Sequence, residues 1–220
     1  MSDWGRLAFV DVETTGLSPT ENRIAEIGVV TVGGGSVERW TTLLRTSSRG
    51  ERTAPLGSSP HGTPDAPCFS DIAADLARRL EGRLFVAHNA RFDYAFLRSE
   101  FERAGIAFHP DVICSVMLSR HLSPGLAHHD MDSLASRHGF RVEERHRALP
   151  DADLVWQLWQ ALHRQHPKAR IADVVGALLS GPVLPPELDA SLIDRLPESP
   201  GAYVLYGDCL LYTSPSPRDS

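Results

Sequence analysis

The feature that most constrains the fold is a short apolar stretch near the N-terminus, FVDVETTGL, which carries two carboxylates. Its valines and phenylalanine favour a β-strand. Asp11 and Glu13 are two positions apart, so a strand places both side chains on the same face. Two half-buried carboxylates at that spacing repel each other and require a counter-charge. The stretch therefore predicts a strand that ends at a cation-binding site.

The hydrophobic pattern along the rest of the chain predicts strands first and then strands alternating with helices. The expected strands are 6–12, 24–32, 37–45, 84–87 and 112–114. The expected helices run from Ser70 to Gly82, from Asn89 to Gly105, over 115–121 and 131–138, onward from Pro150, and over 171–179. Short links between the first three strands favour an antiparallel arrangement. This order predicts an α/β fold with a mixed sheet and helices packed against it.

Two later stretches carry further polar residues at the ends of expected elements. VAHNARFDYAFL, residues 86–97, has Asp93 on the helix that follows a strand. HRALPDA, residues 146–152, has His146 five positions before Asp151. With Asp11 and Glu13 they give four carboxylates and one histidine, which we expect to converge at one edge of the sheet.

Together the motifs DxETTG, HNxxFD and HRAxxDA resemble those of the DEDDh family of 3′–5′ exonucleases, typified by the epsilon subunit of bacterial DNA polymerase III. The resemblance covers about residues 7–165, with all motifs in the family's order and spacing. It implies an RNase H-like fold, in which helices flank a mixed five-stranded sheet. It also implies an enzyme that hydrolyses phosphodiester bonds.

The resemblance further implies two Mg²⁺ or Mn²⁺ ions, bridged by Asp11. Glu13 and Asp151 would lie beside the ion that activates water, and Asp93 would support the other. His146 would be the general base, a role that suits an imidazole near neutral pH. The chemistry agrees, because hard divalent ions prefer oxygen ligands and two ions stabilise both the attacking and the leaving oxygen.

By the same resemblance, residues around the metal site would contact the substrate. These are Thr14, Thr15, Gly16, His88, Asn89 and Phe92. His61 and Gly62, in a long loop, match a similar pair in relatives. Alternatives stay open for some of them: His88 and Asn89 would also suit a strand-end turn, and Phe92 a core position. Glu26 matches an acidic position for which we expect an ion pair or ring packing, and residues 128–130 suit a solvated loop.

Four segments are expected along the chain. Residues 1–166 form the exonuclease domain, and 167–195, rich in Gly and Pro, form a linker. Residues 196–208, LPESPGAYVLYGD, resemble the start of a UvrC-type GIY-YIG nuclease domain, truncated before its other motifs. Residues 209–220 resemble an in-frame translation of a sequencing adapter and are interpreted as a non-native tail.

Composition narrows the function further. The net charge of −6 excludes bulk electrostatic coating of nucleic acid, so contacts with it must be local or carried by metal ions. Three scattered cysteines, with no membrane-length apolar run, predict a cytoplasmic protein. We expect an exonuclease acting on single-stranded DNA 3′ ends in repair or proofreading, with a polymerase or repair partner not specified by the sequence. The alternatives are an exoribonuclease or oligoribonuclease acting on RNA ends and a non-catalytic nucleic-acid-binding module.

Overall fold

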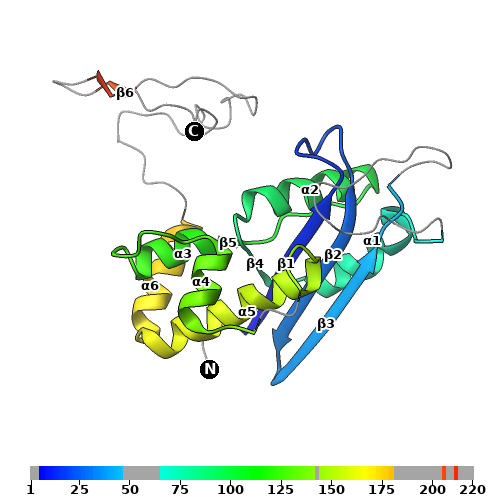
Figure 1. Cartoon of the computed structure of the whole chain (residues 1–220). Coiled ribbons are helices and arrows are strands. Elements are labelled where there is room, and N and C mark those ends of the chain that lie inside the picture. Colours follow the sequence, from blue (N-terminus) through cyan, green and yellow to red (C-terminus); the bar gives the residue numbers. More distant parts are fainter. Residues whose placement is uncertain (1–4, 47–64, 142–143, 181–204, 207–210, 213–220) are drawn as a thin grey trace. The chain divides into compact units, whose positions relative to one another are not determined.

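The computed structural model describes residues 5–46, 65–141, 144–180, 205–206 and 211–212 (Figure 1). The chain divides into two units, Met1–Gly181 and Pro182–Ser220. The strands of the first unit are β1 (Arg6–Thr14), β2 (Ile24–Gly33), β3 (Ser36–Leu43), β4 (Leu84–Ala87) and β5 (Val112–Cys114). Its helices are α1 (Phe69–Leu80), α2 (Arg91–Arg103), α3 (Ser115–Leu122), α4 (Met131–His138), α5 (Ala148–Gln165) and α6 (Lys168–Leu179).

The five strands form one mixed sheet in the order β3-β2-β1-β4-β5. β1, β2 and β3 pair antiparallel, whereas β4 and β5 join β1 in parallel. Gly34 and Gly35 take positive φ angles in the tight turn between β2 and β3, a conformation that glycine adopts without strain. The predicted five-stranded mixed sheet flanked by helices is confirmed.

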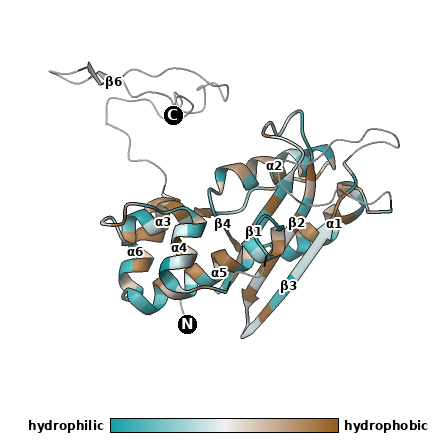
Figure 2. Ribbon diagram, in the orientation of Figure 1, coloured by the Kyte–Doolittle hydropathy of each residue, from teal (hydrophilic) through white to brown (hydrophobic). Residues whose placement is uncertain are grey.

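Alternation along β1 separates two hydrophobic clusters, one on each face of the sheet. Leu7 and Phe9 pack with α3, α4, α5 and α6, whereas Ala8, Val10 and Val12 pack with α1 and α2. In Figure 1, α5 crosses the sheet on the first of these faces. The central strands are largely apolar and the edge strand β3 is largely polar in Figure 2. The face that carries Phe9 continues toward Asp11 and Glu13.

Helix α6 corrects the prediction that residues 167–195 are a linker. Ile171, Val174 and Val175 are buried in the same cluster as α3 and α5. These apolar residues recur on one face of the helix, and that face packs into the core. The helix, which ends at Leu179, therefore belongs to the first unit. The Gly and Pro content that suggested a linker lies mostly after Leu179. The domain boundaries beyond this point stay a prediction.

Local element ends differ slightly from the sequence expectations. Helix α1 begins at Phe69 with Cys68 as its N-cap, two residues before the expected cap, Ser70. Helix α2 follows Ala90 rather than Asn89, which takes a φ of 62° and makes no side-chain cap. In the second unit the structure describes an antiparallel pair, β6 (Leu205–Tyr206) with β7 (Leu211–Tyr212). The other residues interpreted as GIY-YIG start and tail lie outside the described residues.

No helix in the described ranges is long and apolar enough to span a membrane.

Candidate active site

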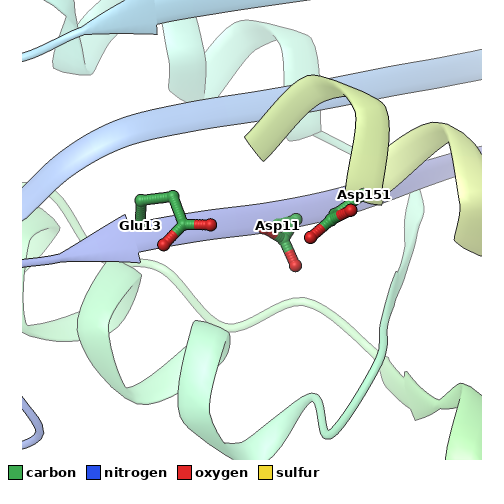
Figure 3. A group of neighbouring side chains, drawn as sticks. All are labelled: Asp11, Glu13 and Asp151. Atoms are coloured by element: carbon green, nitrogen blue, oxygen red, sulfur yellow. The ribbon is translucent and has the colours of Figure 1, made fainter. Parts of the chain in front are cut away.

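The end of β1 places the first two carboxylates. Asp11 and Glu13 project from the face of β1 that α5 covers (Figure 3). The pairing of β1 with β2 shifts between Glu13 and Thr14, so the strand bends directly after the second carboxylate. The carboxylates therefore stand where the sheet stops and the chain turns away.

The first turn of α5 brings Asp151 to this strand end, where Figure 3 shows it beside Asp11. The packing of Phe9 against Trp156 and Trp159, with ring centroids 5.1 and 5.9 Å apart, holds the helix over β1. One carboxylate oxygen from each of Asp11, Glu13 and Asp151 lies within 4.8 Å of the others. Three residues from distant parts of the chain thus form a single acidic cluster.

Asp93 approaches the cluster from the β4 side of the sheet. Strand β4 pairs with β1 only as far as Phe9, so the backbone N–H of Val12 has no strand partner there. That N–H donates to Oδ1 of Asp93 at 3.1 Å. Asp93 is 3% exposed, and its charge raises the pKa of Asp11. The fourth carboxylate therefore lies near Asp11 and Glu13.

The carboxyl groups of the cluster have raised pKa values. Burial, followed by the charges of Asp93, Asp151 and Glu13, raises the pKa of Asp11 well above its ordinary value. Burial also raises the pKa of Asp93 to about 8, and it raises the pKa of Glu13 and of Asp151. Burial is the largest cause of all these shifts, and the nearby Arg145, which lowers the pKa of Asp11, Glu13 and Asp151, does not reverse them. A divalent cation with oxygen ligands supplies further positive charge, so the residues fit a metal.

His146 lies in the loop that leads into α5. Its backbone N–H donates to Oδ2 of Asp151 at 3.3 Å, and its φ is 61°. The side chain is exposed, and its charge lowers the pKa of Glu13, so the imidazole is within electrostatic reach of the cluster. Neighbouring Arg145 forms ion pairs with Asp151 and Asp132. The predicted histidine is therefore brought to the cluster.

Thr14, Thr15 and Gly16, the TTG turn, follow Glu13 at the end of β1. The hydroxyl of Thr14 donates to the carbonyl of Gly16 at 2.7 Å. The backbone N–H of Thr15 donates to the carbonyl of Arg23 at 2.9 Å, and the backbone N–H of Arg23 donates to the Thr15 hydroxyl at 3.0 Å. A Cβ on Gly16 would overlap the end of the Asn22 side chain, which would then have to move. The structure thus places Thr14, Thr15 and Gly16 next to Glu13, and their contacts with substrate stay a prediction.

The structure places His88, Asn89 and Phe92 of the second motif in different surroundings. Nδ1 of His88 lies 2.9 Å from the Ser115 hydroxyl, and burial lowers the pKa of His88 to about 4. Asn89 is exposed. Phe92 is half-buried and packs on Phe96 with ring centroids 4.9 Å apart, so it contributes to the core. His61 and Gly62 lie outside the described residues.

One residue that the sequence did not single out, Arg145, contacts the cluster. Its partner there is Asp151. Leu17, beside the TTG turn, is 67% exposed. The expected ion pair of Glu26 is confirmed, and its partner is Arg147. Local spacing carries no signal for such pairs, because their members come from different elements.

A family model for exonucleases, RNase T, matches residues 8–158. The chain belongs to this exonuclease family. The exonuclease is 34% identical over 168 residues to DNA polymerase III subunit epsilon of Treponema pallidum, covering 72% of this chain and 76% of that protein. It is 31% identical over 159 residues to the 3′-5′ exonuclease DinG of Bacillus subtilis, covering 68% of this chain but 16% of that protein.

Among solved structures, exonuclease I matches the exonuclease with a TM-score of 0.57 at 16% identity, over 77% of this chain and 43% of that one. A second match is E. coli exonuclease I in complex with a dA16 oligonucleotide, with a TM-score of 0.57 at 15% identity, over 80% of this chain and 43% of that one. These likenesses confirm the RNase H-like fold. The family model and the sequence relatives make the exonuclease an enzyme of the 3′–5′ class.

Proposed function

We propose that this exonuclease removes nucleotides from the 3′ ends of single-stranded DNA with the help of two divalent ions, Mg²⁺ or Mn²⁺. The observation that carries the proposal is the acidic cluster, in which oxygens of Asp11, Glu13 and Asp151 lie within 4.8 Å and Asp93 adjoins them. When bound, two such ions make a water nucleophilic and stabilise the leaving oxygen of a phosphodiester. Asp11 is central to the cluster and would bridge the ions.

The protein's own residues would bind, orient and move protons around that centre. His146 would accept the proton of the attacking water, because a neutral imidazole is a suitable base near neutral pH. The backbone bond from His146 to Asp151 supports this role, since it keeps the histidine loop beside a metal ligand. Glu13 and Asp151 would hold the ion near that water, and Asp93 the other.

The terminal nucleotide would lie against the turn after β1. Gly16 allows a backbone to approach closely, and Thr14 and Thr15 border the acidic cluster. The exposed side chain of Leu17 offers apolar surface for a base. His88, Asn89 and Phe92 would contact the same nucleotide from the β4 side. Contacts of this kind tolerate any base, which suits an enzyme that trims every sequence.

DNA as substrate, and a role in repair or proofreading, are supported by the relatives. One relative is a DNA polymerase III epsilon subunit, and exonuclease I of the same fold is solved with DNA oligonucleotides. The PolC-type relative from Caldanaerobacter subterraneus is matched over only 11% of its length, so its other activities do not transfer.

The test uses a 5′-labelled oligonucleotide, Mg²⁺ or Mn²⁺, and a gel that resolves single nucleotides. We expect a ladder that shortens from the 3′ end, that EDTA abolishes, and that the Asp11→Asn variant does not produce. A matched RNA of the same sequence runs beside the DNA, and faster cleavage of RNA would replace the DNA proposal with the exoribonuclease alternative. Equal ladders from wild type and Asp11→Asn would reject the assigned site.

A further inference from the structure

Strand β2 carries two residues directly opposite the carboxylates of β1. In the antiparallel pairing, Glu26 lies across from Glu13 and Gly28 lies across from Asp11. Paired residues of neighbouring strands share a face, so both stand under the start of α5. Neither belongs to the acidic cluster defined by Asp11, Glu13 and Asp151.

Gly28 lets the start of α5 lie directly on the sheet. A Cβ built at Gly28 would come well inside 3.0 Å of the backbone of Ala148 and Leu149, closer than real Cβ atoms approach. Both contacted groups are main-chain atoms, which cannot rotate away as a side chain can. Any side chain at this position would therefore lift the first turn of α5 away from β1, and Asp151 with it.

Glu26 binds Arg147, the residue directly before the first turn of α5. Glu26 is 2% exposed, and Nε of Arg147 donates to its two oxygens at 3.2 and 3.0 Å. The carbonyl of Arg147 accepts the first hydrogen bond of α5, from the backbone N–H of Asp151 at 3.1 Å. Arg147 also follows His146 directly in the chain. One arginine thus links a buried carboxylate on β2 to both the histidine and the last carboxylate of the site.

The position of Glu26 is unfavourable for stability alone. Like charges directly opposite each other on neighbouring strands destabilise a sheet, and the charge of Glu26 raises the pKa of Glu13. The Arg147 side chain is 31% exposed, and a partly buried ion pair of this kind adds little net stability. An arrangement with this cost is explained if it places the α5 turn accurately.

We propose that Glu26 and Gly28 are positioning residues: together with Arg147 they determine where His146 and Asp151 stand relative to Asp11 and Glu13. Gly28 sets how closely the turn approaches the sheet. The Glu26–Arg147 pair sets the position of the first turn of α5 along β2. The inference rests on the proposed function only in assigning a metal to the cluster, and its main measurement is metal affinity.

The experiment compares wild type with Glu26→Gln, Arg147→Gln and the double variant. Mn²⁺ affinity is measured by calorimetry. The kcat and KM values are measured on a labelled oligonucleotide, and folding is followed by circular dichroism. Residues that orient metal ligands typically contribute about 10- to 100-fold to affinity or activity, and we expect each single variant to lose Mn²⁺ affinity and kcat in that range. KM for the oligonucleotide should stay close to the wild-type value, and the double variant should be no worse than either single one.

Arg39→Gln is the matched control. Arg39 on β3 pairs with Asp153 of α5 at 2.7 Å, so it also joins the sheet to this helix, but away from the cluster. We expect this variant to keep wild-type Mn²⁺ affinity and kcat. An equal loss from Arg39→Gln would reduce the effect to general helix docking and overturn the proposal.

Two further variants keep the proposal open to refutation. Gly28→Ala should lower Mn²⁺ affinity more than Glu26→Gln does, because the added methyl group meets backbone. If Glu26→Gln fails to fold, Arg147→Lys decides, since lysine keeps the charge but cannot reproduce the planar guanidinium contact. Wild-type affinity in Arg147→Lys, or loss of its fold, would overturn the proposal. A wild-type protein that binds Mn²⁺ but shortens no oligonucleotide would reject the proposed function alone.

Discussion

The carboxylate of Asp93 accepts a hydrogen bond from the backbone N–H of Val12, although the two residues are 81 positions apart in the chain. The bond forms where β4 has ended and β1 continues, so a side chain takes the place of a strand partner. It holds Asp93 in a buried position beside Asp11, and burial raises the pKa of Asp93 to about 8. The stability of the fold is thereby linked to the protonation of the site.

In metal-free buffer, the free energy of unfolding should fall as the pH rises from about 4 to about 8. The unfolded chain releases the proton of Asp93 near the ordinary value of 3.8, whereas the folded protein keeps it up to about 8. Between these values the folded state binds more protons, so the stability present at low pH is lost as the pH rises through the folded pKa. Burial acts on Asp11 in the same direction.

The check is thermal unfolding in EDTA at a series of pH values. Asp93→Asn cannot titrate, so its unfolding midpoint should depend less on pH and should exceed that of wild type at pH 8. Parallel profiles for the two proteins would contradict the assignment.

Added Mn²⁺ should reverse this loss at pH 8. A ligand that binds only the folded state at a hundred times its Kd stabilises it by about 2.7 kcal/mol. The midpoint should therefore rise in wild type and fall again with EDTA, whereas Asp11→Asn should show no rise. Asp153→Asn is the control: Asp153 is an acidic residue of α5 that pairs with Arg39, and this variant should respond like wild type.

His146→Asn should lower kcat by roughly 10²- to 10⁴-fold, the usual contribution of a general base. Asparagine tolerates the positive φ of this position better than most residues, so the loop should keep its conformation. The backbone bond to Asp151 remains, and Mn²⁺ affinity should not change. His163→Gln, on α5, is the control and should retain full kcat. Loss of metal affinity in His146→Asn would instead make this residue a ligand or a support.

His88 should stay neutral throughout the range in which the enzyme is assayed. Burial, and then the charge of Arg145, lowers its pKa to about 4. Its imidazole resonances in an NMR titration should be constant between pH 8 and pH 5 and should move only below that. Any activity change between pH 5 and pH 8 would then belong to another group. A His88 midpoint near 6.5 would show that the ring is more solvated than the structure has it.

Arg23→Gln should loosen the turn that follows β1. Arg23 binds both oxygens of Glu100 on α2 at 2.6 and 2.8 Å, and Glu100 is 1% exposed. A buried acceptor that loses its partner costs about 1–3 kcal/mol, offset here by Arg103 at 3.4 Å. We expect lower stability and a higher KM, with Mn²⁺ affinity retained. An unchanged KM would show that this turn does not contribute to substrate binding.

Local patterns in the sequence determined much of this protein. The apolar pattern predicted the strands of the sheet, and the i, i+2 spacing placed Asp11 and Glu13 on one face. The motif spacing predicted that Asp93, His146 and Asp151 would come to that strand end. The first of these features depends on periodicity within one element, which a single sequence displays directly, whereas the convergence of the motifs rested on their resemblance to a known family.

Only the tertiary structure decided how those groups are held. Nothing local indicates that Glu26 would pair with Arg147, 121 positions away, or that Gly28 would meet the backbone of α5. The same holds for helix α6, whose Ile171 enters the core although Gly and Pro nearby suggested a linker. Such contacts depend on register and on the packing of helices over the sheet. A sequence specifies these through the summed packing of the whole core, and no short segment carries them alone.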